Sequence, residues 1–420
     1  MNYIVSNLIS CRFYSDSLFR RVCLSLTLFF FFCACGTREE QHQKPQFEPL
    51  KIGADRLFEE PYHTWIKGKR VGLITNQTGV DSSLRPVAEL LAEDPEVQLT
   101  ALFGPEHGIS GESQAGSKIV DGPKIFSLYG DRRAPDAEML KEVDLLVFDI
   151  QDVGSRFYTY ISTMYEAMKA AAEHKKPFIV LDRPNPIGGI QVEGPVLEEG
   201  RESFVGIFPI PIRHGMTAGE LAQLFNAESD LKLDLQVVPL LNWDRSEWAG
   251  TGLQWIAPSP NMPTPDTAAL YPGFCLIEGT NLSEGRGTTR PFQLIGAPWL
   301  KATQLAGRLN DGGIPGAFFR PQRFTPMFSK HSELSCAGIQ IHVLDHTVFE
   351  PVSAALRFIQ EAIQLHPNEL EFRANSFDRL IGNSWVREAL EEGSDVESIE
   401  ARWQGELEVF KARREAYLLY

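Results

Sequence analysis

A carboxylic acid and an imidazole, Glu106 and His107, stand among three glycines and a proline in LFGPEHGISG, residues 102–111. The segment continues VQLTALF, an apolar run typical of a β-strand. A turn needs glycine and proline but not Glu-His, and glycines allow a ligand to come close to the backbone. A carboxyl group held partly out of water there can act as a general acid. We therefore predict that Glu106 is catalytic and that His107 binds substrate; the alternative is a tight turn with two solvated residues.

Polar residues also follow the other apolar runs in this part of the chain. They are Asn76 after the first run, Asp149, Asp152 and Arg156 after the third, and Asp182, Arg183 and Asn185 after the fourth. In an open parallel sheet, ligands bind beyond the carboxyl ends of the strands. Four polar strand ends in a row therefore indicate a ligand site. Each residue taken singly is equally consistent with a helix cap or a closed turn.

The loop EGTNLSEGRGTTRPF, residues 278–292, carries two arginines, Arg286 and Arg290, among glycines. It also carries two carboxylic acids, Glu278 and Glu284. Paired arginines suit a carboxylate or phosphate ligand. We predict that both arginines bind substrate, although a solvated loop with internal charge pairing has the same pattern.

Apolar runs alternate with amphipathic segments from residue 70 onward. The predicted strands are 70–80, 97–104, 143–154, 177–186 and 231–240, and the predicted helices between them are 84–93, 135–142, 157–176 and 218–228. Thr217 reads as the N-cap of the last helix, with Glu220 at the capping-box position. Continuous apolar strands separated by helices indicate a parallel sheet covered on both faces. We predict an α/β fold with a Rossmann-like, doubly wound parallel-sheet domain over residues 50–255.

A second, smaller α/β domain is predicted over residues 256–420. It begins with a proline- and glycine-rich passage, 257–292, that we expect to be surface loop and that contributes a cleft loop at about 278–292. The predicted elements that follow are a helix at 300–309, strands at 316–324 and 337–345, a helix at 351–366 and a charged helix near 397–418.

The bulk composition narrows the class of protein. The chain has 420 residues and a net charge of -15, which argues against a general nucleic-acid binder because such a protein needs a basic face. No G-x-G-x-x-G follows the first predicted strand, and the histidines do not show a metal-binding spacing such as H-E-x-x-H. We therefore expect neither a cofactor nor a metal.

The first 35 residues have the pattern of an export signal. Arg20 and Arg21 precede the short apolar segment CLSLTLFFFFCAC, which is too short for a comfortable membrane span. The sequence FCAC resembles a bacterial lipobox, so we predict lipidation at Cys35 and an exported lipoprotein, periplasmic or associated with the outer membrane; plain secretion is the alternative. Residues 36–49 are predicted to be a polar tether.

The motifs together resemble those of one bacterial family, long described only as a domain of unknown function, that includes exo-acting β-N-acetylmuramidases. The matching segments are GLITNQTGV, LFGPEHGISG, VFDIQDVGSRFYTYISTM, LDRPNPIGG with VEGP, PIRHGMTAGELA, PSPNMPT with ALYPG, and EGTNLSEGRGTTRPF. The resemblance extends from about Ile52 to residue 420. It implies a Rossmann-like domain plus a small auxiliary domain, with an active site in the cleft between them.

The resemblance also implies an activity. Family members remove N-acetylmuramic acid from the non-reducing ends of peptidoglycan fragments without a cofactor, and the family's proposed catalytic glutamate matches Glu106. Glycosidases usually use two carboxyl groups, and Asp149, Asp152, Glu278 and Glu284 compete for the second role, with Asp149 and Glu284 as our choices. Arg156, Arg286 or Arg290 would hold the lactyl carboxylate, with Asn76, His107 and Asp152 as further substrate-binding residues. The 2-acetamido group of the substrate is an alternative nucleophile.

Two other classes of function remain open. A non-catalytic muropeptide-binding lipoprotein would need the arginines but would tolerate Glu106→Gln. An esterase or amidase is disfavoured because no G-x-S-x-G nucleophile motif is present.

Overall fold

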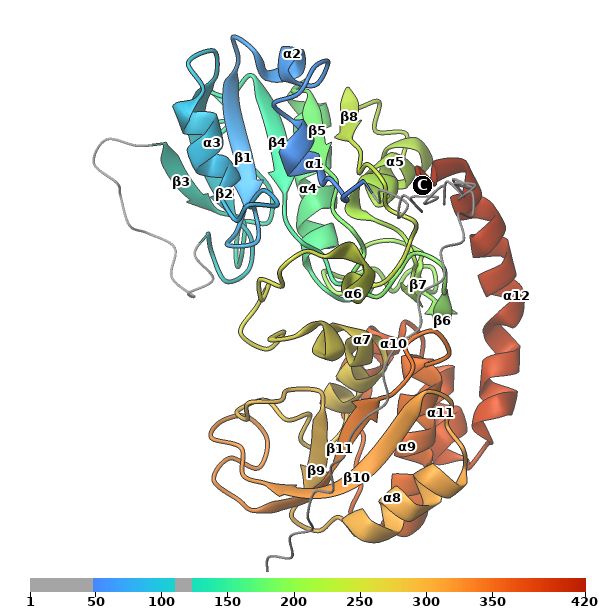
Figure 1. Cartoon of the computed structure of the whole chain (residues 1–420). Helices are drawn as coiled ribbons and strands as arrows, with labels where there is room; N and C mark the ends of the chain where they lie inside the picture. Colours follow the sequence, from blue (N-terminus) through green and yellow to red (C-terminus); the bar gives the residue numbers. More distant parts are fainter. Residues whose placement is uncertain (1–47, 110–122) are drawn as a thin grey trace, which may run out of the picture. The chain divides into compact units, whose positions relative to one another are not determined.

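A six-stranded parallel sheet organises the N-terminal half of the protein, as a computed structural model of residues 48–109 and 123–420 shows (Figure 1). The strand order is β3-β2-β1-β4-β5-β8. The strands are β1 (Arg70–Thr75), β2 (Gln98–Gly104), β3 (Lys124–Ser127), β4 (Leu145–Asp149), β5 (Phe178–Leu181) and β8 (Leu235–Val238). The order runs outward from β1 in both directions, so the predicted doubly wound α/β fold is confirmed.

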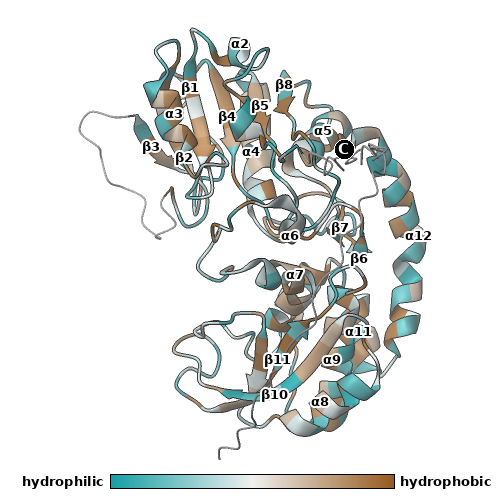
Figure 2. Ribbon diagram, in the orientation of Figure 1, coloured by the Kyte–Doolittle hydropathy of each residue, from teal (hydrophilic) through white to brown (hydrophobic). Residues whose placement is uncertain are grey.

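Helices cover both faces of this sheet because successive residues of each strand point to opposite sides. In β4, Leu146 and Phe148 pack in one apolar cluster with Met164 of α4 (Tyr160–Glu173). Leu145 and Val147 pack in the other with residues of α1 (Gly53–Arg56) and α3 (Val87–Glu93). A side chain fully buried in this way contributes about 1.5–3 kcal/mol. This burial explains the continuous apolar runs, and the central strands are mainly brown in Figure 2.

The C-terminal half is built on a smaller antiparallel sheet. Its strand order is β10-β11-β9, with β9 (Leu294–Ala297), β10 (Ala317–Phe324) and β11 (Cys336–Val343). Its helices are α8 (Ala302–Asp311), α9 (Pro351–Leu365), α10 (Ala374–Ile381), α11 (Trp385–Glu391) and α12 (Val396–Arg414), followed by the 3-10 turn η2 (Glu415–Tyr417). The α8, α9 and α12 helices lie close to their predicted positions.

The remaining elements are mostly short. They are the two-stranded pair β6 (Glu193–Val196) and β7 (Pro211–Arg213), the helices α2 (His63–Ile66), α5 (Ala218–Glu228), α6 (Trp248–Thr251) and α7 (Pro265–Phe274), and the 3-10 turn η1 (Cys275–Gly279). The α5 helix has the predicted capping box, in which Thr217 Oγ1 accepts from the Glu220 amide and the Glu220 carboxylate accepts from the Thr217 amide.

Two of the predictions for secondary structure are wrong. The passage 257–292 is not all surface loop, because it contains α7 and η1, most of whose residues are buried. Pro265 begins α7 and Pro272 lies inside it, so the residues that suggested a loop belong to a short buried helix. The predicted helix at 135–142 is a series of turns that still buries Met139 and Leu140.

Both cysteines of the described part, Cys275 and Cys336, are buried free thiols. None of the helices in residues 48–109 and 123–420 is long and apolar enough to cross a membrane.

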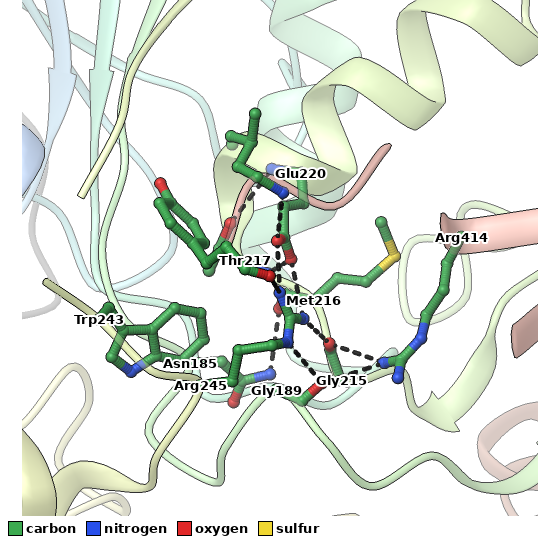
Figure 3. Close-up of polar contacts among 12 residues, drawn as sticks. Asn185, Gly189, Gly215, Met216, Thr217, Glu220, Trp243, Arg245 and Arg414 are labelled. Carbon is green, nitrogen blue, oxygen red and sulfur yellow. Dashed lines mark hydrogen bonds and ion pairs between the residues drawn. The ribbon is translucent and has the colours of Figure 1, made fainter. Parts of the chain in front are cut away.

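The end of the chain returns to the large sheet through a network of buried polar groups (Figure 3). Arg245 pairs with Glu220 at 2.7 Å and donates to the Gly215 carbonyl, which also accepts from Arg414 at the end of α12. Beyond α12, the Tyr420 hydroxyl donates to Asp182 Oδ2 at 2.7 Å. These contacts fix the last residues against the carboxyl end of β5.

Tyr420→Phe tests the last of these contacts. The change removes a donor from the buried Asp182 carboxylate and an acceptor from the Leu240 amide, which lies 2.8 Å from the hydroxyl. We expect the free energy of unfolding to fall by about 1–3 kcal/mol in chemical denaturation. Tyr417→Phe is the matched control and should change it by less than about 0.5 kcal/mol. Equal effects of the two substitutions would show that the Tyr420 hydroxyl contributes nothing.

The pH dependence of stability gives a second test at Asp182. Burial raises the pKa of Asp182 from 3.8 to about 6, although Thr217 and Tyr420 donate to it. A raised pKa in the folded state stabilises the protein below the unfolded value, and this stabilisation disappears as the pH rises through 6. The unfolding free energy of the wild type should therefore fall relative to that of Asp182→Asn, by about 2 kcal/mol between about pH 4 and 6.5. A difference that stays constant over this range would contradict the assignment.

Candidate active site

Glu106 lies on a tight turn just beyond the end of β2. The turn is closed by His107 and Gly108, both with positive φ, at 72° and 75°. The Thr159 hydroxyl, at the start of α4, donates to Glu106 Oε2 at 2.9 Å. The nearby Glu106 carboxylate raises the pKa of the Tyr129 hydroxyl. The Thr159 hydroxyl thus holds one oxygen of the carboxylate from another segment of the chain.

A pocket of about 490 Å³, mouth included, opens beside Glu106. Its lining residues are Glu106, His107, Phe157, Tyr158, Thr159, Tyr160, Ser259, Asn261, Met262, Tyr271, Arg286 and Phe292. We call this cavity the Glu106 pocket.

Aromatic rings form much of the pocket wall. Tyr271 packs edge-on against Phe157, Tyr158 and Phe292, with ring centroids 5.4, 5.6 and 4.9 Å apart. Tyr160 packs edge-on against Tyr158, and its hydroxyl donates to the Pro258 carbonyl. The interlocked rings make a rigid wall that offers apolar faces beside polar groups, a surface suited to a sugar ring.

His107 shares the pocket with Glu106. Burial lowers the pKa of His107 and Arg286 lowers it further, while Glu106 opposes them. The imidazole is therefore neutral at pH 7, so it can accept a hydrogen bond from a ligand hydroxyl as well as donate one.

Arg286 connects the Glu106 pocket to a second cavity. Its guanidinium pairs with Glu278 at 2.7 Å and lies over the ring of Phe292, 5.2 Å from the centroid. Burial opposes the charge of Arg286, but the interactions with Glu278 outweigh it and raise the pKa. Arg286 therefore stays charged between the two cavities.

The second cavity, about 790 Å³ with its mouth, is rich in basic residues. Its lining residues are Val205, Glu278, Glu284, Arg286, Ser329, Lys330, Arg373, Ser376, Arg379 and Leu380. We call it the cationic pocket. Glu284 is almost completely buried there and pairs with Lys330 at 2.9 Å and with Arg286 at 3.6 Å.

Asp149, predicted to be catalytic, lies away from both pockets. Asp149 is the last residue of β4, its side chain is fully buried, and its Oδ1 lies 2.6 Å from Nε of Arg183. Arg183 also donates to the Val80 carbonyl at 2.7 Å. In this structure Asp149 lines neither pocket, and its ion pair with Arg183 joins two strand ends.

Asn76 and Asp152, which also follow strands, do not line the Glu106 pocket. Asn76 Oδ1 accepts from the amide and the hydroxyl of Thr78 and so closes the turn after β1. Asp152 Oδ2 accepts from the Gly154 amide, and burial raises its pKa to about 7. Its charge acts on Tyr158 and Tyr160, so it lies close behind the aromatic wall.

Arg156 and Arg290, both predicted to bind substrate, also lie away from the two pockets. Arg156 is fully buried and donates to three backbone carbonyls, those of Pro195, Ile210 and Leu380, at 2.8–3.0 Å. Arg290 is exposed, bonds to Gln293 at 3.1 Å and lines neither pocket. Of the three predicted arginines, the structure places only Arg286 at the candidate site.

Sequence reasoning missed several residues that line the two pockets. Phe157, Tyr158, Thr159 and Tyr160 were read only as the beginning of a helix, although aromatic and hydroxyl groups directly after a polar strand end are a usable signal. Lys330, Arg373 and Arg379 come from segments distant in sequence, and nothing in their local pattern sets them apart from other surface cations.

Comparisons with known proteins agree with this geometry. A family model described as Exo-beta-N-acetylmuramidase NamZ, N-terminal, matches residues 71–266, and its C-terminal counterpart matches residues 269–420. The peptidoglycan β-N-acetylmuramidase NamZ of Bacillus subtilis is 48% identical over 395 residues, which cover 92% of this chain and 95% of that protein.

Two crystal structures of DUF1343 family proteins from Bacteroides fragilis have the same fold. One is 41% identical with a TM-score of 0.84 and covers 90% of this chain and 100% of that one. The other is 33% identical with a TM-score of 0.72 and covers 89% of this chain and 99% of that one. By its sequence and its fold, the chain belongs to the exo-β-N-acetylmuramidase NamZ family.

Proposed function

We propose that this chain is an exo-acting glycoside hydrolase that releases N-acetylmuramic acid from the non-reducing ends of peptidoglycan fragments. The observation that carries the proposal is the Glu106 pocket, in which one oriented carboxyl group shares a rigid aromatic wall with His107 and Arg286. The 48% identity to a peptidoglycan β-N-acetylmuramidase supports the same substrate class.

The chemistry requires a proton donor at the glycosidic oxygen, and Glu106 has the position for it. The Thr159 hydroxyl holds Oε2 and leaves the carboxyl group beside the pocket. The aromatic faces pack against a sugar ring and remove water from around the breaking bond. His107 and Asn261 provide hydrogen-bonding groups for the sugar's hydroxyl and acetamido substituents.

The second group of the reaction has fewer candidates than the sequence suggested. Asp149 and Asp152 lie behind the pocket walls, whereas Glu278 and Glu284 line the adjoining cationic pocket. The acetamido group of the substrate is the further candidate. The anomer formed first distinguishes an inverting water attack from the two retaining routes.

We also propose that the protein is exported and anchored through a lipid on Cys35. Support comes from the basic residues, the short apolar segment and the FCAC sequence that precede the folded part. These residues lie outside the part of the chain that the structure describes. The proposed location is the periplasm or the inner face of the outer membrane, where peptidoglycan fragments are found.

Glu106→Gln tests the catalytic assignment. Glutamine keeps the shape of the side chain and can still accept from Thr159, but it cannot donate the proton. We expect kcat/KM for a chromogenic β-N-acetylmuramide to fall about 10²–10⁴-fold, without added metal or nucleotide. The wild type should not cleave the matching β-N-acetylglucosaminide.

Glu93→Gln is a matched control, because Glu93 is exposed at the end of α3 and lines neither pocket. It should retain wild-type activity. Full activity of Glu106→Gln would rule out Glu106 as the acid, and a wild type that binds the muramide without releasing the chromophore would be a non-catalytic binding protein. Cleavage of both glycosides would indicate a broad hexosaminidase.

Cys35→Ala tests the proposed anchor. The wild type expressed in a Gram-negative host should appear in the membrane fraction, with a mature N-terminus at a lipid-modified Cys35 by mass spectrometry. The variant should move to the soluble fraction or keep its signal segment. An unmodified mature N-terminus at another residue would exclude the anchor and leave plain secretion.

A further inference from the structure

The cationic pocket has no role yet in the proposed reaction. Its walls come from four segments that are far apart in sequence: Val205, the loop around Glu284 and Arg286, the β10–β11 loop with Lys330, and α10 with Arg373 just before its start and Arg379 in its last turn. Arg286 lines this pocket and the Glu106 pocket. A ligand seated beside Glu106 therefore has an adjoining space for a substituent.

The charges of this pocket are not balanced internally. Both of its carboxylates are already paired, Glu278 with Arg286 at 2.7 Å and Glu284 with Lys330 at 2.9 Å. Within the described ranges, Arg373 and Arg379 have no ion-pair partner. Two cationic side chains thus remain available at the wall of a cavity, in a chain whose net charge is -15.

The surroundings of Lys330 show the same excess of positive charge. Its ammonium group, only 10% exposed, donates to the carbonyls of Ile277 and Thr280 at 2.9 Å. Burial lowers the pKa of Lys330; the ion pair with Glu284 opposes this, and the nearby charge of Arg373 lowers it further. An anion in the cavity would relieve the repulsion between these cations.

The start of α10 adds to the attraction for an anion. Arg373 immediately precedes the helix, and Ser376 in its first turn also lines the cavity. Unpaired amide groups at a helix N-terminus favour negative charge. The helix supports the arginine side chains and does not make the site by itself.

We propose that the cationic pocket binds a carboxylate carried by the O3 substituent of the muramyl sugar and so selects muramyl over glucosaminyl substrates. The inference rests on the proposed function, because it assumes that the sugar ring occupies the Glu106 pocket. Muramic acid differs from glucosamine by a lactyl ether at O3, which ends in a carboxylate. Guanidinium groups bind carboxylates through paired, charge-assisted hydrogen bonds. Two sources of the carboxylate fit, the lactyl group itself and a short peptide attached to it.

The test compares substrates that differ only in this substituent. The enzyme variant is the double substitution Arg373→Ala and Arg379→Ala, and both residues are exposed, so the fold should be kept. The substrates are chromogenic β-glycosides of N-acetylmuramic acid, of its uncharged lactyl amide, and of N-acetylmuramyl-L-alanyl-D-isoglutamine. Arg402→Ala, on the exposed side of α12, is the matched control and should behave as the wild type.

We expect the double variant to lose about 10- to 150-fold in kcat/KM on the muramic acid glycoside. On the lactyl amide it should lose less than about 3-fold, since the missing charge leaves nothing for the arginines to bind. If the dipeptide glycoside behaves like the lactyl amide, the lactyl carboxylate is the ligand. If the wild type cleaves it faster than the lactyl amide and the double variant loses this advantage, the peptide carboxylate is the ligand.

Equal losses on the charged and uncharged substrates, or no loss on either, would overturn the inference while leaving the hydrolase activity intact. Absence of cleavage by the wild type would instead refute the proposed function. Calorimetric titration with free N-acetylmuramic acid and with N-acetylglucosamine gives a readout that does not depend on catalysis: the double variant should lose affinity for the acid and none for the neutral sugar.

Discussion

The ion pair between Asp149 and Arg183 is the interaction on which the carboxyl edge of the large sheet depends. It joins the end of β4 to the end of β5, and the second contact of Arg183, with the Val80 carbonyl, adds the segment after β1. Both side chains are buried, so removing one partner would leave an unpaired charge inside the protein, typically at a cost of about 3–5 kcal/mol. The pair therefore fixes three strand ends in one arrangement, and the loops that carry the Glu106 pocket start from this edge.

Four cationic side chains of the described residues, Arg156, Arg414, Arg286 and Lys330, differ in what satisfies them. Arg156 and Arg414 each donate hydrogen bonds to backbone carbonyls of segments that are far apart in the chain. Arg286 and Lys330 are paired with carboxylates and face open space. The first arrangement uses the charge to hold the fold together. The second keeps charge at a cavity wall, where a ligand can reach it.

The sequence was a good guide to the sheet and to the position of the site, and a poor guide to which side chains face it. Continuous apolar runs are diagnostic because strands buried on both faces need them, and the Thr217–Glu220 capping box is a local motif that depends on few distant contacts. The polar residues at the strand ends can be identified from the sequence because they directly follow these apolar runs. Whether such a residue points into a pocket, like Glu106, or into the wall, like Asp149, depends on partners from other segments.

The α7 helix and the role of Lys330 show what local pattern leaves out. The α7 helix begins with a threonine N-cap and a proline at its first position, but Pro272 inside it and the proline-rich surroundings give the passage the composition of a loop, and its packing in the core supports the helix. The local sequence does not distinguish Lys330 from other lysines, and its role depends on the β10–β11 loop, which places it beside Glu284. Both are consequences of tertiary contacts, which a single sequence does not display.

The long-range polar contacts have a consequence for how such proteins assemble and diversify. Arg156 donates to the Leu380 carbonyl, and Arg414 donates to the carbonyls of Gly189 and Gly215. Asp182 accepts from the Tyr420 hydroxyl. During synthesis, the large sheet is made first, but a buried group such as Asp182 has no partner until the residues after α12, up to Tyr420, have left the ribosome. If recombination exchanged one half of the chain between relatives, the hydrogen-bond partners of these buried groups would come from different proteins. The two halves are therefore expected to be inherited together, and a chimaera should fold only if the residues on both sides of these contacts match.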